Sequence, residues 1–363
     1  NNSHANTSTQ LAGMVAGNPN LAKGEARVIL NEVNTRDPSR LNGYIEVAGQ
    51  KAQVVIANPA GISCDGCGFI NANRATLTTG QVQYGNGQIS GYDVNRGEII
   101  IQGGGLDASS VDSTDLLARA VKINAGVWAQ ELKVTAGRNQ IDAAHSRTTA
   151  KSADGSALPA VAIDVSALGG MYAHKIRLVG TERGVGVHNA GNIGAAAGDV
   201  AISADGALSN RGVIQSAQNL QLSVKGDLHN QGQLYAGKDS VVTASATLTN
   251  DGMIAAQGDT RIAANALRSA QNSTLAAGLN SDGSTASSGA LTLNSQSSLA
   301  LNGRNMAAGT LTAQGRTVDL DNSRTSGARI VVSAASGNIT TRDAVVAASE
   351  KLQLAASGKL NNH

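Results

Sequence analysis

Three consecutive twenty-residue segments share one pattern: VAISADGALSNRGVIQSAQN at 200–219, LQLSVKGDLHNQGQLYAGKD at 220–239 and SVVTASATLTNDGMIAAQGD at 240–259. Each segment has a leucine, an asparagine and a glycine at fixed positions, of which Leu228, Asn230 and Gly232 are the middle set. Apolar and polar residues alternate within the segments, which is the period of β-strands with one buried face. The segments therefore predict strands and exclude helices.

Such a short unit, repeated every 20 residues, can bury its apolar face only by stacking on copies of itself. The repeat predicts an all-β fold, a right-handed parallel β-helix in which each coil adds about 4.8 Å. The equivalent asparagines should stack into a ladder joined through their side-chain amides; they are Asn189, Asn210, Asn230 and Asn250. The glycine two positions after each asparagine should supply a positive φ at the corner.

The repeat does not cover the whole chain. It loosens after Leu267, and a Gly/Ser-rich stretch from Gly278 to Gly289 predicts a loop on the solenoid. Before residue 188 the alternation persists without the 20-residue register, so we divide the chain into residues 1–188, a module with hairpins and loops outside the coils, and residues 189–363, a repeat stalk. One helix-like segment, Asp112–Ala120, has capping residues ahead of two leucines; helix and extended chain both stay open there.

Composition argues against several classes of protein. The 363 residues include 28 Lys and Arg and 26 Asp and Glu. This near-balance of charge disfavours a general binder of nucleic acid or membrane surfaces. Aromatic residues make up 2% of the chain, which argues against an ordinary globular enzyme core. No apolar run approaches the roughly 18 residues of a membrane helix.

No pattern typical of a catalytic or metal site stands out, and we expect no catalytic residue, cofactor or metal. Gly103-Gly104-Gly105 lacks the Lys-Ser/Thr of a phosphate loop and predicts a surface loop. The acidic residues of the repeats fall mostly at turns, without the carboxylate pair that a glycosidase needs. The histidines show no metal-ligand spacing and are expected at surface or coil positions; they are His4, His145, His174, His188, His229 and His363.

Several motifs together resemble the secretion domain of two-partner-secretion exoproteins, the family of filamentous haemagglutinin. They are Asn18-Pro19-Asn20-Leu21, Val28-Ile29-Leu30-Asn31-Glu32-Val33, Asn58-Pro59-Ala60-Gly61-Ile62, Cys64-Asp65-Gly66-Cys67-Gly68-Phe69-Ile70-Asn71 and Thr76-Leu77-Thr78-Thr79-Gly80, with Gly169-Gly170-Met171-Tyr172-Ala173 downstream. The resemblance covers about residues 1 to 200, and the haemagglutinin-type repeat covers most of the rest.

Within this family, the cysteine pair followed by Gly68-Phe69-Ile70-Asn71 resembles contact-dependent growth inhibition toxins and secreted haemolysins more than filamentous haemagglutinin itself. Ala60 stands where the haemagglutinin motif has Asn. The resemblance also implies that the sequence starts after the first stretch of the secretion domain, without a signal peptide and an N-terminal cap.

The two Asn-Pro segments and the cysteine pair each have two interpretations. The segments 18–21 and 58–62 are good turn sequences, because Asn initiates turns and Pro fixes φ, and they are also candidates for contact with an export partner. Cys64 and Cys67 have the spacing of a redox motif, but no βαβ pattern surrounds them. In an exported protein we expect them to form a small structural disulfide.

The resemblance implies an exoprotein of a Gram-negative bacterium, secreted or at the cell surface, that passes through the periplasm and crosses the outer membrane through a β-barrel partner with POTRA domains. We expect a monomeric, non-enzymatic secretion-targeting domain and the start of a filamentous stalk, presenting distal toxin or adhesin domains in contact-dependent growth inhibition. Distal regions would contact a receptor on a target bacterium or host cell, and no nucleic-acid partner is expected. The alternatives are a haemolysin or host-cell adhesin of the same family and, more remotely, a β-helix enzyme acting on polysaccharides.

Overall fold

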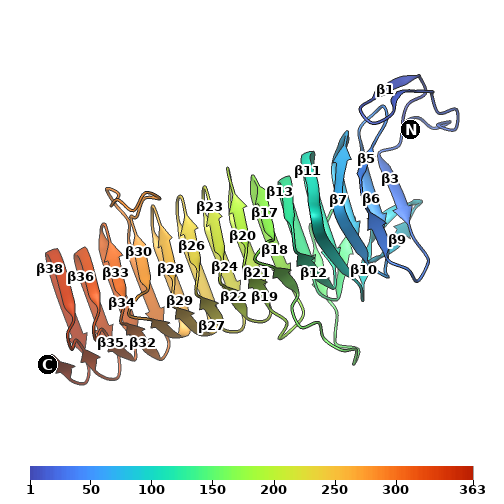
Figure 1. Ribbon diagram of the computed structural model, residues 1–363. Helices are drawn as coiled ribbons and strands as arrows, with labels where there is room; N and C mark the ends of the chain where they lie inside the picture. The colour runs from blue at the N-terminus through green and yellow to red at the C-terminus, as the bar shows by residue number, and fades with distance from the viewer. Residues whose placement is uncertain (363) are drawn as a thin grey trace. The chain divides into compact units, whose positions relative to one another are not determined.

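The computed structural model describes residues 1–362, which fold into β-strands without any α-helix (Figure 1). They form two compact units, Asn1–Val185 and the residues from Gly186 onward. Each unit is a parallel β-solenoid, so the prediction of an all-β parallel β-helix is confirmed. No helix in the described part of the chain has the length and apolarity to cross a membrane.

Three parallel sheets form the coils of the first unit. The first sheet contains β3 (Val28–Glu32), β6 (Ala52–Ala57), β8 (Ala72–Thr78), the ends of β11 (Glu98–Ala118) and β13 (Gly126–Ala136), and β18 (Lys175–Gly180). The second sheet contains β4 (Ser39–Leu41), the starts of β7 (Ile62–Ile70) and β11, β12 (Ala120–Ile123) and β16 (Ile163–Val165). The third sheet contains β5 (Tyr44–Glu46), the end of β7, the middle of β11, the start of β13 and β17 (Gly170–Ala173).

Two antiparallel elements of the first unit lie outside its coils. One is the hairpin of β1 (Thr7–Thr9) and β2 (Gly13–Val15); the other is a four-stranded sheet of β15 (Thr148–Ala150), β14 (Asn139–Asp142), β10 (Gln88–Val94) and β9 (Gln81–Gly85). The four-stranded sheet buries Tyr92 and Ile141 against Val55, Ala57 and Leu117, which point outward from the first sheet of the solenoid. This covering explains why the run from 54 to 56 is apolar without alternation, because a strand covered on both faces has no polar side.

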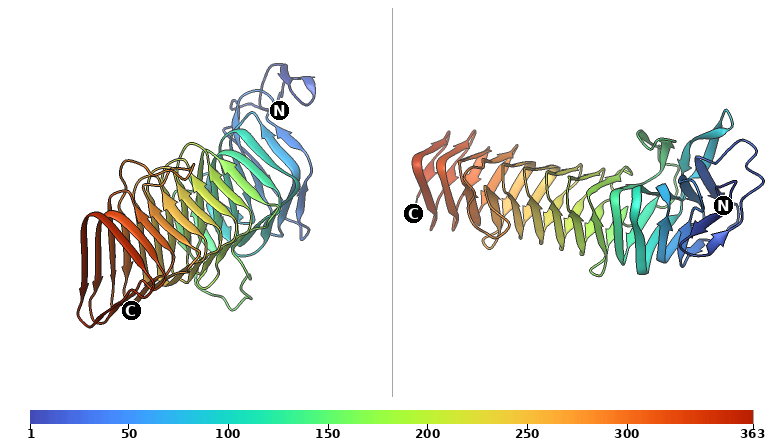
Figure 2. Two further views of the ribbon diagram at one scale, coloured as in Figure 1. Left: turned by 60° about the vertical axis from the view of Figure 1, so that its left-hand side comes forward. Right: turned by 90° about the horizontal axis from the view of Figure 1, so that it is seen from above.

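Three parallel sheets also form the second unit, in which the coils are more regular (Figure 2). The first sheet contains β21 (Val200–Ala204), β24 (Leu220–Val224), β27 (Ser240–Asn250), β29 (Thr260–Ser269), β31 (Leu291–Ser295), β34 (Thr310–Gly315), and the ends of β36 (Arg324–Ala334) and β38 (Val345–Ala356). The second contains β19 (Val187–Asn189), β22 (Leu208–Asn210), β25 (Leu228–Asn230), the ends of β27 and β29, β32 (Ser298–Leu301), β35 (Thr317–Asp319), β37 (Ile339–Thr340) and β39 (Leu360–Asn361). The third contains β20 (Asn192–Ala195), β23 (Val213–Ser216), β26 (Gln233–Ala236), β28 (Met253–Ala256), β30 (Thr274–Ala277), β33 (Arg304–Ala307), and the starts of β36 and β38.

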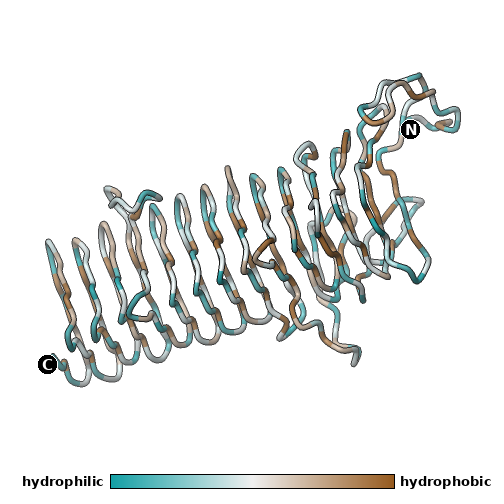
Figure 3. Tube along the Cα trace, viewed as in Figure 1, coloured by the Kyte–Doolittle hydropathy of each residue, from teal (hydrophilic) through white to brown (hydrophobic). Residues whose placement is uncertain are grey.

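The register of the second unit places identical positions of the repeat directly over one another. Leu208 pairs with Leu228, and Leu228 with Leu248. All three leucines are fully buried, and brown apolar segments alternate with teal polar ones along the coils (Figure 3). Because each buried leucine is worth about 2 kcal/mol, these aliphatic columns hold the stack together without large aromatic side chains.

The stretch from Gly278 to Gly289 is a loop, as predicted, and it covers part of the outer surface. Leu279 packs on Tyr235, Ala255 and Met306, which point outward from the third sheet of the second unit. The Tyr235 hydroxyl donates a hydrogen bond of 3.0 Å to the carbonyl oxygen of Leu279. The insertion therefore shields an apolar patch that the coils leave uncovered.

The helix considered for Asp112–Ala120 is wrong. Residues 112–118 are the last part of β11, which pairs in parallel with β8 on one side and β13 on the other, and Ala120 begins β12. Leu116 points into the coil and Leu117 is buried under the four-stranded sheet. Because β8 and β13 pair with this end of β11 from both sides, tertiary pairing overrides a capping signal that could support barely two helical turns.

The role expected for the glycines of the repeat is also wrong. Gly212, Gly232 and Gly252 do not have a positive φ. A methyl group at Gly232 would instead overlap the carbonyl oxygen of Gly212 in the preceding coil, and the same contact recurs at Gly252. Glycine is required here because two backbones approach closely, not because the corner needs a left-handed residue.

This close approach predicts a marked difference between two Gly→Ala substitutions. Gly232→Ala should lower the free energy of unfolding by about 2 kcal/mol, because the added methyl group meets backbone that cannot move aside. At Gly194 the nearest atom to an added methyl group is the Gln215 side chain at 3.8 Å, so Gly194→Ala should be neutral or stabilise by about 0.5 kcal/mol. Urea unfolding of the two variants measures both values. Equal destabilisation would contradict the contact between the coils.

Candidate functional site

The first motif, residues 18–21, forms a turn that holds the start of the chain. The Asn18 side-chain amide donates a 3.0 Å hydrogen bond to the carbonyl oxygen of Asn1, and the Asn18 backbone N–H donates a 2.8 Å bond to Ser3. The Asn18 Oδ1 accepts a 3.0 Å bond from the Asn20 N–H, which is the local turn expected for asparagine. Asn18 is half-buried, whereas Pro19 and Asn20 are exposed. The motif therefore both fixes local structure and presents a surface.

Residues 1–3 are in turn anchored on the first coils. Asn2 is buried, and its side-chain amide donates 2.9 Å bonds to the carbonyl oxygens of Ala26 and Gln50. Its backbone pairs with Gly49 in a parallel bridge. These contacts fix the start of the chain against residues 26, 49 and 50.

The second motif, residues 58–62, is a turn with half-buried residues at Pro59 and Ala60 that joins three successive coils. The Asn58 side-chain amide donates 2.9 Å bonds to the Asp37 carbonyl oxygen and the Ser39 hydroxyl of the preceding coil, and its Oδ1 accepts a 2.9 Å bond from Ala60. The Asn58 N–H donates a 2.9 Å bond to Thr78 in the following coil. Asn58 has no exposed surface. The two motifs therefore contact different parts of the chain: Asn18 bonds to residues 1 and 3, whereas Asn58 links neighbouring coils and stabilises the solenoid.

Cys64 and Cys67 form a disulfide across a bulge of β7, with their Cα atoms 5.4 Å apart. Both are buried, and Gly66 between them has a φ of 66°. The glycine run 103–105, expected to be a surface loop, is instead a matching bulge within β11. Side chains at 103 or 104 would overlap Asp65 and Gly66, so the glycines allow the two bulges to stack.

Breaking this bond should have a modest effect. The double variant Cys64→Ser/Cys67→Ser should lower the free energy of unfolding of the first unit by about 2 kcal/mol, because the bond closes a loop of only four residues. Differential scanning calorimetry of the full chain should show a melting temperature lower by about 4 to 8 °C for this unit. Adding a reductant to the double variant should change nothing further. Identical melting temperatures for the wild type and the variant would contradict a structural role.

The asparagines of the repeat form a ladder inside the second unit. The side-chain amide of Asn189 donates to the Oδ1 of Asn210, Asn210 to Asn230, and Asn230 to Asn250, each at 2.8 Å. All four residues have no exposed surface. The ladder ends where Asn250 donates to the Ser269 hydroxyl at 3.3 Å. Each amide also reaches backbone carbonyl oxygens, so the buried polar atoms are satisfied.

A buried cluster of ionisable side chains lies between the solenoid and the four-stranded sheet, and the sequence analysis missed it. Arg74 of β8 pairs with Asp115 of β11 at 2.9 Å. Nδ1 of His145, from the β14–β15 turn, lies 3.2 Å from the Asp115 carboxylate and 2.7 Å from the Arg74 guanidinium. Lys133 of β13 donates a hydrogen bond to the His145 carbonyl oxygen, and the ring of Tyr92 packs edge-on against His145. The cluster fastens the sheet to the coils.

His145 is 2% exposed and lies in the turn between β14 and β15, so of the two expected positions, surface or coil, the surface position is wrong for this histidine. His4 and His174 are exposed, His188 and His229 are half-buried, and His363 lies outside the described residues. The φ of 57° at His145 marks the tight turn that points its ring inward. Because Arg74, Asp115 and His145 are far apart in sequence and outside the repeat, no spacing signal identifies them.

The cluster predicts a pH-dependent contribution to stability. Burial acts to raise the pKa of Asp115, but the hydrogen bonds and charges of His145 and Arg74 outweigh it and hold this pKa below its ordinary value. A carboxyl with a lowered folded-state pKa stabilises above its unfolded pKa of about 3.9, and that stability is lost as the pH falls through the folded value. Asp115→Asn should therefore cost about 2 kcal/mol at pH 7 and less at pH 3, which lies below the unfolded pKa. Urea unfolding at the two pH values tests this; an equal cost at both would contradict the ion pair.

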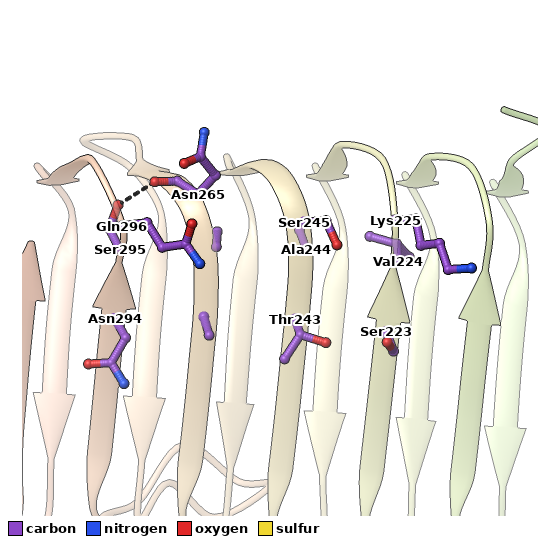
Figure 4. Close-up of a pocket in the computed structure, with 12 residues that line it drawn as sticks. Ser223, Val224, Lys225, Thr243, Ala244, Ser245, Asn265, Asn294, Ser295 and Gln296 are labelled. Carbon is purple, nitrogen blue, oxygen red and sulfur yellow. Dashed lines mark hydrogen bonds between the residues drawn. The ribbon is translucent and has the colours of Figure 1, made fainter. Parts of the chain in front are cut away.

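A shallow groove crosses four coils of the second unit (Figure 4). It is lined by short side chains, among them Ser223, Thr243, Asn265, Asn294 and Gln296. Of its lining residues only Lys225 is ionisable, and Lys225 pairs with Asp205 at 2.7 Å. Because glycosidases act with two carboxyl groups, this groove does not support the polysaccharide-active alternative.

A parallel solenoid with an antiparallel sheet outside its coils, two Asn-Pro turns and a stack of asparagine-bearing repeats defines the class of secretion domains of repeat exoproteins. The family model of the TPS secretion domain matches residues 1–210, and that of the haemagglutinin repeat matches residues 215–295. The chain belongs to the TPS secretion domain family. It is a secretion-targeting domain followed by the start of a repeat stalk, from a protein secreted or displayed at the surface of a Gram-negative bacterium.

Known proteins similar to the chain agree with this family. The chain is 70% identical over 220 residues to "Toxin CdiA" of Yersinia pestis, covering 61% of the chain, and 52% identical over 210 residues to "tRNA nuclease CdiA-2" of Burkholderia pseudomallei, covering 57% of the chain. A solved secretion domain of filamentous haemagglutinin is 35% identical, with a TM-score of 0.58, over 67% of this chain and 81% of that one. The matched region spans only 7% of each of the two toxins. Their names describe the whole proteins.

Proposed function

We propose that the chain is the N-terminal export region of a contact-dependent growth inhibition toxin, and that it crosses the outer membrane through a dedicated β-barrel transporter with POTRA domains. The observation that carries this proposal is the 70% identity over 220 residues to "Toxin CdiA" of Yersinia pestis. The repeats then begin a stalk that holds a distal toxin away from the producing cell, where distal regions meet a receptor on the target.

The non-repeating sequence is concentrated in the first 210 residues, which supports an export signal there. The two Asn-Pro turns, the disulfide bulge and the four-stranded sheet all lie there. A repeat that recurs every 20 residues cannot supply a unique address, but it can supply length. Because each new coil buries apolar side chains, folding outside the cell opposes return through the transporter.

We further propose that this region is monomeric and catalyses no reaction. The polar side chains that it buries bond mainly to one another, as in the asparagine ladder and the pair of Arg74 and Asp115. Any toxin activity would belong to another part of the full-length protein.

A co-culture experiment tests the proposal. Cells that produce the natural full-length protein with its transporter are mixed with neighbours that lack immunity, and viable neighbours are counted. Inhibition should require cell contact, and it should disappear when the region after the repeats is removed while surface display stays normal. Normal display of the intact protein without inhibition would overturn the toxin assignment and favour an adhesin or haemolysin.

A further inference from the structure

Three of the chain's seven aromatic side chains lie in one exposed row on the third sheet of the first unit. Tyr44 and Asp107 both pair with Gly68, Asp107 pairs with Trp128, and Trp128 pairs with Tyr172. The three rings are 41 to 45% exposed. We call Tyr44, Trp128 and Tyr172 the aromatic strip. A row of exposed rings in a chain so poor in aromatic residues points to an interaction.

The rings of the aromatic strip lie flat along the sheet because glycines make room beneath them. A methyl group at Gly126 would come within 2.5 to 3.0 Å of the Trp128 ring, and one at Gly170 within 2.6 to 2.7 Å of the Tyr172 ring. Gly68 leaves the same space under Tyr44. The centroids of the Trp128 and Tyr172 rings are 6.3 Å apart and their planes differ by 21°. The two rings are therefore neighbours with nearly parallel planes, and with the ring of Tyr44 they form the platform of the aromatic strip.

Hydrogen-bonding groups border this platform. Asp107 lies between Tyr44 and Trp128, and its carboxylate accepts a 2.8 Å hydrogen bond from the Tyr44 hydroxyl. Gln130 follows Trp128 by two residues on the same face of β13, and its side-chain amide donates a 2.7 Å bond to the Ser109 carbonyl oxygen. The platform thus has a row of rings and, beside it, a row of polar side chains.

We propose that the aromatic strip binds the pyranose rings of a neutral polysaccharide. A pyranose has an apolar C–H face that packs on a flat aromatic ring, and hydroxyl groups at its edge that bond to side chains such as Ser109 and Gln130. Glycine, serine, glutamine and aspartate surround these rings, so hydrogen-bonding partners for sugar hydroxyl groups lie beside each aromatic face. The Asp107 carboxylate disfavours sulfated or phosphorylated sugars, because like charges repel. The proposal does not depend on the toxin assignment.

Trp128 is the only tryptophan of the chain, so its fluorescence reports directly on the platform. We would titrate the folded full chain with cellohexaose, maltohexaose, chitohexaose and a neutral O-polysaccharide, and follow emission and quenching by acrylamide. At least one of these sugars should give a saturable change and protect Trp128 from acrylamide. Tyr172→Ala should weaken that binding by about tenfold. Tyr84→Ala removes a ring on β9, outside the strip, that is even more exposed at 58%, and it should leave binding unchanged.

Gln130→Ala distinguishes binding from a purely structural role, since it removes a bordering side chain and leaves every ring in place. It should weaken binding several-fold with an unchanged melting temperature. If the rings serve only to stabilise the coils, Tyr172→Ala will lower the melting temperature while none of the four sugars alters the fluorescence, and the proposal is overturned. A response only to dextran sulfate, or only to purified POTRA domains of the transporter, would also overturn it. Export of the aromatic-strip variants reports separately on the proposed function.

Discussion

Replacing Asn230 by leucine is expected to lower the free energy of unfolding of the second unit by about 4 kcal/mol. The Asn230 side-chain amide donates a 2.8 Å hydrogen bond to Oδ1 of Asn250, and its Oδ1 accepts a 2.8 Å hydrogen bond from Asn210. All three side chains are shielded from solvent. Leucine is close in size but removes both bonds, so an amide of Asn210 and a carbonyl oxygen of Asn250 each lose a partner in a buried position. Because the defect spans three coils, the ladder should be weakened beyond the substituted residue. Urea unfolding measures the loss.

Gln231 supplies the matched control for this prediction. It is adjacent to Asn230 but exposed, and its side chain accepts only a 3.0 Å bond from Arg211. Gln231→Leu should therefore change the free energy of unfolding by no more than about 0.5 kcal/mol. If both leucine variants unfolded at the same urea concentration, the ladder would contribute nothing to stability.

Replacing Asn58 by alanine is expected to destabilise the first unit by about 3 kcal/mol and to reduce export of the full chain several-fold. The substitution removes three side-chain hydrogen bonds, to Asp37, Ser39 and Ala60, in a position without solvent. The expected loss of export follows from failed folding, since Asn58 presents no surface that a transporter could contact. Thermal unfolding of the purified chain and the amount of protein in the medium measure the two effects.

Asn20, exposed in the other motif, separates folding from recognition. Asn20→Ala should leave the melting temperature within about 2 °C, because its side chain is at the surface. A loss of export in this variant would assign recognition to the first motif. An Asn58→Ala chain that melted at the wild-type temperature would contradict the supporting role assigned to the second motif.

The repeat region could be predicted almost completely from sequence, because identical residues at a fixed spacing meet identical environments. Asn210 and Asn230 are 20 residues apart, which is one coil, so they stack directly and bond to each other. The predicted positive φ at Gly232 is wrong because a recurring glycine in the sequence has two possible causes. Either the backbone torsion angles or a close backbone contact can require glycine there. Only the position of the preceding coil, with the Gly212 carbonyl oxygen under the missing side chain, distinguishes the two causes.

The first unit could be predicted only in part, because its contacts join residues that no period relates. The Asn-Pro motif at 58 indicates a turn, but its bonds to residues 37 and 39 depend on how the coils stack. Asp115 lies in a stretch whose local signals resemble a helix start, and its actual partners are Arg74 and His145, 41 and 30 residues away in sequence. Pairing with distant strands therefore determines that this segment is a strand, and distant side chains determine the partners of the buried Asp115 carboxylate.

Export of separated parts of the chain tests the central claim most directly. Residues 1–210 and residues 211–363, each behind the same signal peptide, would be produced with the cognate transporter, and the protein in the medium and in the periplasm would be measured. We expect residues 1–210 to reach the medium and residues 211–363 to stay in the periplasm. Transporter-dependent release of residues 211–363, with residues 1–210 retained, would show that the repeats carry the export address and would contradict the assignment of the first 210 residues as the secretion domain.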